Sequence, residues 1–262
     1  MAAVELHVDA QSGIATITLN RPDVLNAIDV DLAWALHHAV MPLERRDDIR
    51  CIVLCGAGKA FCAGGNVAEF NVRAADCPAL IEELLDALNP VVELFSRYSA
   101  PIMASVHGVV AGAGLSLVSG CDLAIAADNT RFLMAYDKVA AAPDCGGTWY
   151  LPQRLGYARA TELMLLGDAW SAEEARAAGL VNRVVPARQL ESEAAALAAR
   201  LAAGPTRAFG QWKHLARAAF GNKLPAHLED ERNAFKCATR TQDFREGVMA
   251  FLERRQAHFT NK

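Results

Sequence analysis

The sequence predicts an α/β fold in which a mainly parallel sheet is followed by a helical C-terminal region. Two stretches repeat the order apolar strand, glycine-rich loop and helix, which is typical of βαβ-like units. The last part of the chain, residues 188–255, is rich in alanine and has a helical pattern. With 262 residues, 53% of them hydrophobic, the chain can bury the core of one large α/β domain or of two smaller ones.

The N-terminal residues predict a β-hairpin followed by a helix. Apolar and polar side chains alternate over residues 4–8 and again over residues 14–19, and Gly13 lies between the two runs. A helix is expected from about Asp29, because leucine and valine then recur at helical spacing as far as Val40.

The first strand–loop unit starts with an unbroken apolar run, residues 52–55. Such a run is typical of a strand that is buried on both faces. It leads into the first glycine-rich loop, residues 56–65. A helical region is expected over residues 80–99, with an interruption at Pro90 because proline lacks a backbone N–H.

The second unit repeats this order further along the chain. Residues 102–107 predict a strand, and residues 108–114 form the second glycine-rich loop. A short apolar helical turn is expected over residues 115–118, followed by a strand over residues 123–127. Together the two units favour a mainly parallel sheet.

The pattern changes in the last third of the chain. Ser171 and Glu174 fit a capping box, which predicts a helix that begins there and ends at Gly179. The next strand is expected over residues 180–185, and it ends at Pro186.

Pro186 is also the expected border between two parts of the chain. We expect residues 1–186 to form the core with the active site, and residues 187–262 to form the helical C-terminal region. Breaks between helices are expected near residues 204–205 and 221–225, where glycine and proline occur. A helical tail of this kind packs on the sheet or on another subunit.

Composition excludes several classes of function. The 26 Lys+Arg and 30 Asp+Glu residues give a net charge of −4, which argues against a nucleic-acid partner. No apolar run approaches the ~20 residues of a membrane helix, and no secretory signal is visible, so we expect a cytoplasmic protein without a membrane partner. Seven cysteines without C-x-x-C spacing and scattered histidines predict neither a disulfide framework nor a metal site.

The two glycine-rich loops are the features with chemical meaning. Glycine lets the backbone approach a ligand closely, and a helix N-terminus offers unpaired N–H groups. Two such loops on neighbouring strands could direct two N–H donors at one oxygen atom, which is an oxyanion hole. The alternative is that both loops are simply tight turns.

Familiar nucleotide and hydrolase motifs do not fit these loops. Residues 56–60 lack the pattern of a P-loop, and residues 112–117 have leucine at the third glycine of a dinucleotide fingerprint. A serine hydrolase with Ser116, His107 and Asp122 fits poorly, because the closing glycine of a nucleophile elbow is absent.

Four segments together resemble the crotonase, or enoyl-CoA hydratase/isomerase, superfamily. The segments are Leu19-Asn-Arg-Pro-x-x-x-Asn-Ala27, Gly56-Ala-Gly-Lys-Ala-Phe-Cys-Ala-Gly64, Val106-His-Gly-x-x-Ala-Gly-Ala-Gly114 and Pro143-Asp-Cys-Gly-Gly-Thr148. They follow the superfamily's order over nearly the whole chain. Within it, residues 132–138 followed by residues 143–149 most resemble the ring epoxyphenylacetyl-CoA isomerases of phenylacetate breakdown.

The resemblance implies a fold and a substrate class. It implies a spiral of ββα units and a helical C-terminal region that mediates trimers, often paired into hexamers. It also implies an acyl-CoA substrate whose thioester oxygen lies between the amides of Gly65 and Ala113. Coenzyme A would enter only as part of the substrate, with no permanently bound cofactor.

The carboxylates distinguish isomerases from hydratases in this superfamily. Hydratases use two glutamates, and here Ser116 and Tyr136 occupy those positions. Isomerases use one carboxylate in a later loop, a position that Asp144 fills. One carboxylate suffices to move a proton between two carbons, so the resemblance favours an enoyl-CoA double-bond or ring isomerase. Alternatively, Asp144 only caps a turn.

Two other functions stay open from the sequence. The chain could be a hydratase with an unusual acid and base, Asp144 together with Asp137. It could also be a catalytically silent subunit that binds coenzyme A. By resemblance, Leu25, Ala27 and Ala63 would contact coenzyme A through backbone atoms.

Three further residues are expected near coenzyme A. Phe259 and Lys262 of a neighbouring subunit would meet one end of the cofactor, with Lys262 attracted to a phosphate. Lys59 could help in the same way. The alternative for Lys262 is a frayed, solvated terminus. Small residues at 140–142 would widen the acyl pocket beside Asp144.

Overall fold

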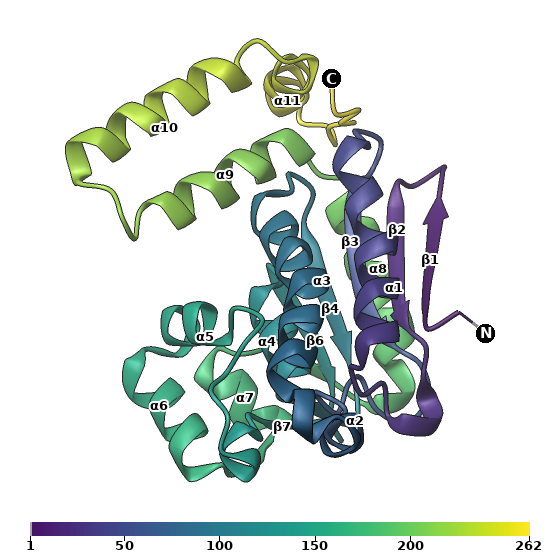
Figure 1. The fold of residues 1–262 in the computed structure, drawn as a ribbon. Helices are drawn as coiled ribbons and strands as arrows, with labels where there is room; N and C mark the ends of the chain where they lie inside the picture. Colours follow the sequence, from purple (N-terminus) through teal and green to yellow (C-terminus); the bar gives the residue numbers. More distant parts are fainter. Residues whose placement is uncertain (1) are drawn as a thin grey trace.

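The computed structural model describes residues 2–262, and its main sheet has six strands in the order β1-β2-β3-β4-β6-β9 (Figure 1). β1 pairs antiparallel with β2, and each later neighbour pairs in parallel. The predicted hairpin and mainly parallel sheet are therefore confirmed. The strands are β1 (Val4–Asp9), β2 (Ile14–Leu19), β3 (Cys51–Gly56), β4 (Ile102–Val106), β6 (Leu123–Ala127) and β9 (Arg183–Val185).

Alternate side chains of β3 face two different cores. Ile52 and Leu54 belong to a large core that includes α1 and α3, whereas Cys51 and Val53 pack with α8. α1 and α3 thus cover one face of the sheet and α8 lies behind it (Figure 1). A strand covered on both faces must be apolar throughout, as its sequence is. The helices are α1 (Val30–Val40), α3 (Cys77–Arg97) and α8 (Leu190–Ala202).

Helix α3 continues through Pro90, so the expected interruption there is wrong. Proline removes one N–H, and the carbonyl left without that donor belongs to Asp86, an exposed residue that water can reach. The opposite face of the helix is buried over its whole length, which keeps the two halves in line. Its buried residues are Leu80, Leu84, Ala87, Leu88, Val91, Leu94 and Phe95.

A second, three-stranded sheet was not predicted from the sequence. Part of the second glycine-rich loop is the strand β5, which pairs in parallel with β7, and β7 pairs antiparallel with β8. The strand expected over residues 180–185 is shorter, because the Leu180 amide still bonds to the carbonyl of Ala175. The strands are β5 (Val109–Ala111), β7 (Arg131–Leu133) and β8 (Trp170–Ser171).

Short helices lie between the strands, and two of them, α4 and α7, connect the two sheets. The predicted turn over residues 115–118 is part of the longer helix α4, whose residues are all buried. The capping box is confirmed, since the side chains of Ser171 and Glu174 each accept from the other's backbone amide and Gly179 ends the helix. These helices are α2 (Val67–Val72), α4 (Ala113–Gly120), α5 (Gly147–Leu155), α6 (Tyr157–Leu166) and α7 (Ala172–Ala178).

Three helices follow α8 at the C-terminus, and α9 and α10 extend beyond the sheet (Figure 1). The two predicted breaks are confirmed, and a third, unpredicted break separates α10 from α11. α8 itself packs on the sheet. Among residues 2–262, no helix combines the length and apolar character that a membrane crossing requires. The helices are α9 (Thr206–Ala218), α10 (Leu224–Ala238) and α11 (Gln242–Glu253).

Candidate active site

The two glycine-rich loops lie side by side. The Cys62 amide donates to the carbonyl of Val109 (3.1 Å), and the Ala111 amide donates to the carbonyl of Cys62 (2.9 Å). Beyond this bridge, a Cβ atom added to Gly112 would lie 3.5 Å from the Cα atom of Gly64. The loops therefore touch at the residues that immediately precede Gly65 and Ala113.

Backbone conformation explains why both touching residues are glycines. Gly64 and Gly112 have φ angles of 92° and 49°, which side chains disfavour. An added Cβ on Gly64 would also lie 3.1 Å from the carbonyl oxygen of Ala111. This close approach of the two loops brings the amides on either side of the contact near one another.

The amides of Gly65 and Ala113 have no hydrogen-bond partner among residues 2–262. Ala113 is the first residue of α4, so its N–H is one that the helix leaves unpaired, at the positive end of the helix dipole. Both amides thus have the properties of donors to an anionic oxygen.

The ring of Phe70 occupies the space that a side chain at position 65 would need. A Cβ atom at this position would lie 2.8 Å from Cζ of Phe70. Phe70 belongs to α2, which begins immediately after this loop with Asn66 as its N-cap. Glycine at 65 and phenylalanine at 70 are therefore complementary, a relation that the sequence pattern did not reveal.

The segment expected to meet coenzyme A runs beside the first loop. The Ala63 amide donates to the carbonyl of Leu25 (3.0 Å), and the Ile28 amide donates to the carbonyl of Gly64 (2.7 Å). Leu25 is exposed, and Ala27 and Ala63 are half-buried. Lys59, at the far end of the loop, is exposed.

Asn26 holds this segment in place. It is fully buried, and its Nδ2 atom donates to the carbonyls of Ala57, Ala60 and Phe61 at 3.0, 2.9 and 3.0 Å. Its Oδ1 atom accepts from the Arg21 amide (2.8 Å). Sequence reasoning treated Asn26 as part of the coenzyme A loop, whereas its side chain points inward and fixes the loop's shape.

Asp144 lies beside the second loop, half-buried. The hydroxyl of Tyr136 donates to its Oδ1 atom at 2.5 Å, and the Ser116 hydroxyl is 3.5 Å from the same tyrosine oxygen. A Cβ on Gly112 would be 4.0 Å from Cζ of Tyr136, so the tyrosine ring links Asp144 to the residue before Ala113. Burial and then the charge of Asp144 raise the pKa of Tyr136, which keeps the hydroxyl protonated.

The residues named for two alternative mechanisms have other partners in the structure. The carboxylate of Asp137 contacts the Lys138 ammonium (2.7 Å) rather than Asp144. Ser116, His107 and Asp122 are also apart, since they bond to Tyr136, the carbonyl of Gly58 and Lys213 respectively. Among residues 2–262, no cluster of His, Cys, Asp or Glu could hold a metal ion.

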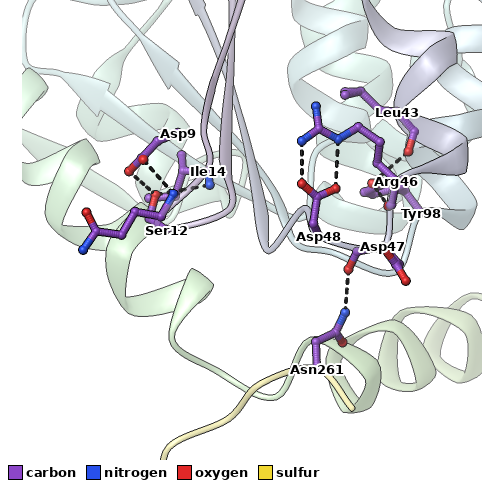
Figure 2. A network of polar contacts seen from close by, with 10 residues as sticks. Asp9, Ser12, Ile14, Leu43, Arg46, Asp47, Asp48, Tyr98 and Asn261 are labelled. Atoms are coloured by element: carbon purple, nitrogen blue, oxygen red, sulfur yellow. Dashed lines mark hydrogen bonds and ion pairs between the residues drawn. The ribbon is translucent and has the colours of Figure 1, made fainter.

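The C-terminal residues lie at the opposite end of the parallel strands from the loops (Figure 1). The Asn261 side chain donates to the carbonyl of Asp47, just before β3 (2.8 Å; Figure 2). The carbonyl of Lys262 accepts from the amides of Gln242 and Asp243, and Phe259 lines a cavity of about 1050 Å³ with α9 and α11. The terminal backbone is therefore anchored rather than frayed.

Comparison with known proteins identifies the family. The family model for enoyl-CoA hydratase/isomerase matches residues 9–262. Over 253 residues, the chain is 41% identical to the 1,2-epoxyphenylacetyl-CoA isomerase of Escherichia coli (strain K12), covering 96% of this chain and 97% of that one. It is 38% identical over 261 residues to a Rhodobacter capsulatus protein named "Probable enoyl-CoA hydratase", covering 98% of each.

Solved structures agree with the sequence comparison. An enoyl-CoA hydratase from Polaromonas sp. JS666 superposes with a TM-score of 0.91 at 33% identity, covering 98% of this chain and 99% of that one. The mixed α/β architecture with a helical C-terminal region is thus the crotonase fold of its structural relatives. As its four motifs predicted, the chain belongs to the enoyl-CoA hydratase/isomerase family.

Proposed function

We propose that this enzyme is an enoyl-CoA isomerase that uses Asp144 as its single base and the amides of Gly65 and Ala113 as an oxyanion hole. The observation that carries the proposal is the composition of the site. Two unpaired amides adjoin the contact between the loops, and one carboxylate lies beside them. The two positions where hydratases of this family have glutamate hold Ser116 and Tyr136 instead.

The reaction follows from these groups. Asp144 removes a proton from the carbon next to the thioester of a β,γ-enoyl-CoA, and the electron pair moves onto the carbonyl oxygen. The two amides stabilise that oxygen, and a single preorganised donor of this kind lowers the activation free energy by ~3 kcal/mol. Protonated Asp144 returns the proton at the γ carbon, which gives the α,β-enoyl-CoA. No water is consumed, so a second acid or base is unnecessary.

We assign coenzyme A to the surface next to the first loop. Backbone atoms of Leu25, Ala27 and Ala63 would bind the adenine and pantetheine, and Lys59 would attract a phosphate. Phe259 and Lys262 lie at the end of the parallel strands opposite to the site of their own chain. They would therefore act on a neighbouring subunit in a trimer or a dimer of trimers. Large exposed apolar side chains on the C-terminal helices support such an assembly. They are Trp212, Phe220, Leu224, Leu228, Phe235, Phe251 and Leu252.

The acyl group is proposed to be a β,γ-enoyl chain or a ring derived from an aromatic acid. The relative that isomerises 1,2-epoxyphenylacetyl-CoA supports the second substrate class. The exposed, small Ala140, Ala141 and Ala142, next to the Asp144 loop, leave space for a bulky group.

Turnover of a β,γ-enoyl-CoA by the wild type and by Asp144→Asn tests the proposal. We expect the variant to lose about 10²–10⁴-fold in kcat, which is the usual contribution of a general base. Asp137→Asn is the matched control, because Asp137 pairs with Lys138 rather than with the site. Undiminished isomerisation by Asp144→Asn would contradict the proposal.

Two outcomes would establish the alternatives. Hydration of crotonyl-CoA, followed as loss of the conjugated thioester absorbance, would identify a hydratase. Tight binding of coenzyme A without turnover of any enoyl substrate would identify a catalytically silent subunit.

A further inference from the structure

Tyr136 is held in an unusually constrained position. It begins the short 3₁₀ helix η4 (Tyr136–Val139), which is flanked by Ala135 and Ala140 at φ angles of 60° and 53°. Cys145, directly after Asp144, has a φ of 50°. Left-handed backbone at residues other than glycine costs free energy and persists only where the surroundings enforce it. Strained residues therefore lie next to both partners of the Tyr136–Asp144 hydrogen bond.

The hydrogen bond has a defined direction and a defined acceptor atom. The tyrosine hydroxyl donates to Oδ1 of Asp144 at 2.5 Å, and the side chain of Tyr136 is almost fully buried. Oδ2 does not take part in this bond. A phenol that donates to one carboxylate oxygen stabilises the ionised form and fixes the plane of the carboxylate.

The thiols next to this pair carry no charge. Burial raises the pKa of the Cys145 thiol, and that of Cys62 to about 12, so both stay neutral. α4 contributes the Ser116 hydroxyl, and α3 and α5 contribute Val92 and Tyr150, which pack on Gly146. The Cys145 thiol also hydrogen-bonds to Asp144, but a thiol is a weak donor, so the tyrosine hydroxyl is the stronger of the two donors to the carboxylate.

We propose that Tyr136 is a positioning residue for proton transfer: its hydroxyl occupies Oδ1 of Asp144, fixes the plane of the carboxylate and thereby presents Oδ2 to the substrate carbon. This inference rests on the proposed role of Asp144 as the base. It also gives a function to the tyrosine at a position where hydratases have an acid. The hydroxyl is a neutral donor that stays protonated, so it holds the base and does not replace the missing glutamate.

The pH dependence of kcat/KM for Tyr136→Phe tests the proposal. Without its donor the ionised carboxylate is less stable, so the acid limb of the profile should move to higher pH by about one unit. We also expect kcat on the plateau to fall about tenfold, because the carboxylate is no longer oriented, while KM changes less than about twofold.

Tyr98→Phe is the matched control for losing a buried hydroxyl. Tyr98 is equally buried, and its hydroxyl donates to the carbonyls of Leu43 and Arg46 rather than to a group of the site (Figure 2). This variant should lose stability without moving the acid limb. The position of the acid limb of the kcat/KM profile therefore distinguishes a positioning role from a merely structural one.

The outcomes distinguish this inference from the proposed function. A folded Tyr136→Phe whose profile superimposes on that of the wild type, while Asp144→Asn is inactive, would overturn the role of Tyr136 alone. Full activity of Asp144→Asn would overturn the proposed function itself. If Tyr136→Phe does not fold, 3-fluorotyrosine at position 136 keeps the shape and strengthens the donor. The acid limb should then move to lower pH, and an unmoved limb would contradict the proposal.

Discussion

The two halves of the site are built from different parts of the protein. The oxyanion half consists of backbone amides at Gly65 and Ala113, beside two left-handed glycines and a bridge of backbone hydrogen bonds. The proton-transfer half consists of the side chains of Asp144 and Tyr136, which both come from the connection between β7 and α5. The first half depends on chain conformation and the second on the chemical identity of two residues. The difference predicts which substitutions each half tolerates.

Removing one backbone donor should have the largest effect on the oxyanion half. Ala113→Pro deletes the N–H at the first position of α4, where proline is compatible with a helix. We expect kcat to fall about 10²–10³-fold with the fold retained, as for the loss of other oxyanion donors. Steady-state kinetics with a β,γ-enoyl-CoA, together with circular dichroism, measure both effects.

Ala172→Pro is a suitable control for this experiment. Ala172 is likewise the first residue of a helix, α7, and it lies outside the site. It should keep most of its activity if proline at such a position is structurally harmless. A folded Ala113→Pro enzyme with wild-type kcat would show that the backbone half does not bind the reacting oxygen.

A buried side chain supports the backbone half, and its loss should have an intermediate effect. Asn26→Ala leaves three carbonyls and the Arg21 amide without their partner. We expect a loss of about 3 kcal/mol in the free energy of unfolding, measured by urea denaturation. Asn20→Ala, which removes exposed hydrogen bonds, should cost about 0.5 kcal/mol. Equal stability of the two variants would contradict the scaffold role of Asn26.

The smallest effect is expected at the C-terminus. If Lys262 attracts a phosphate of coenzyme A bound to a neighbouring subunit, Lys262→Ala should raise KM about two- to fivefold at low ionic strength, with kcat unchanged. High salt should reduce this difference in KM, because dissolved ions weaken the attraction between exposed charges, most strongly beyond about 10 Å. A KM equal to that of the wild type at every salt concentration would remove Lys262 from the binding site.

The family resemblance indicated the two amides of the backbone half, whereas the glycine-rich loops and most of the fold were predictable from the residues themselves. Local signals carried them: alternation in the hairpin, the unbroken apolar run of β3, the capping box of Ser171 and the glycines at 64 and 112. Glycine is required where a left-handed backbone or a close approach occurs, so its pattern is visible without coordinates.

The side-chain half was only partly predictable. The family resemblance indicated Asp144, but the hydrogen bond from Tyr136 depends on how the connection between β7 and α5 folds back on itself. Neither the inward orientation of Asn26 nor the match between Gly65 and Phe70 has a local signal. The continuation of α3 through Pro90 was also missed, because proline affects a helix less where the freed carbonyl faces solvent.

The most direct test of the central claim is a crystal structure with an unreactive acyl-CoA analogue bound. The decisive quantities are the two distances from the thioester oxygen to the amide nitrogens of residues 65 and 113. We predict that both lie within about 2.7–3.1 Å, with the carbon next to the thioester facing Asp144. A thioester oxygen that bonds to only one of these nitrogens, or to neither, would contradict the account.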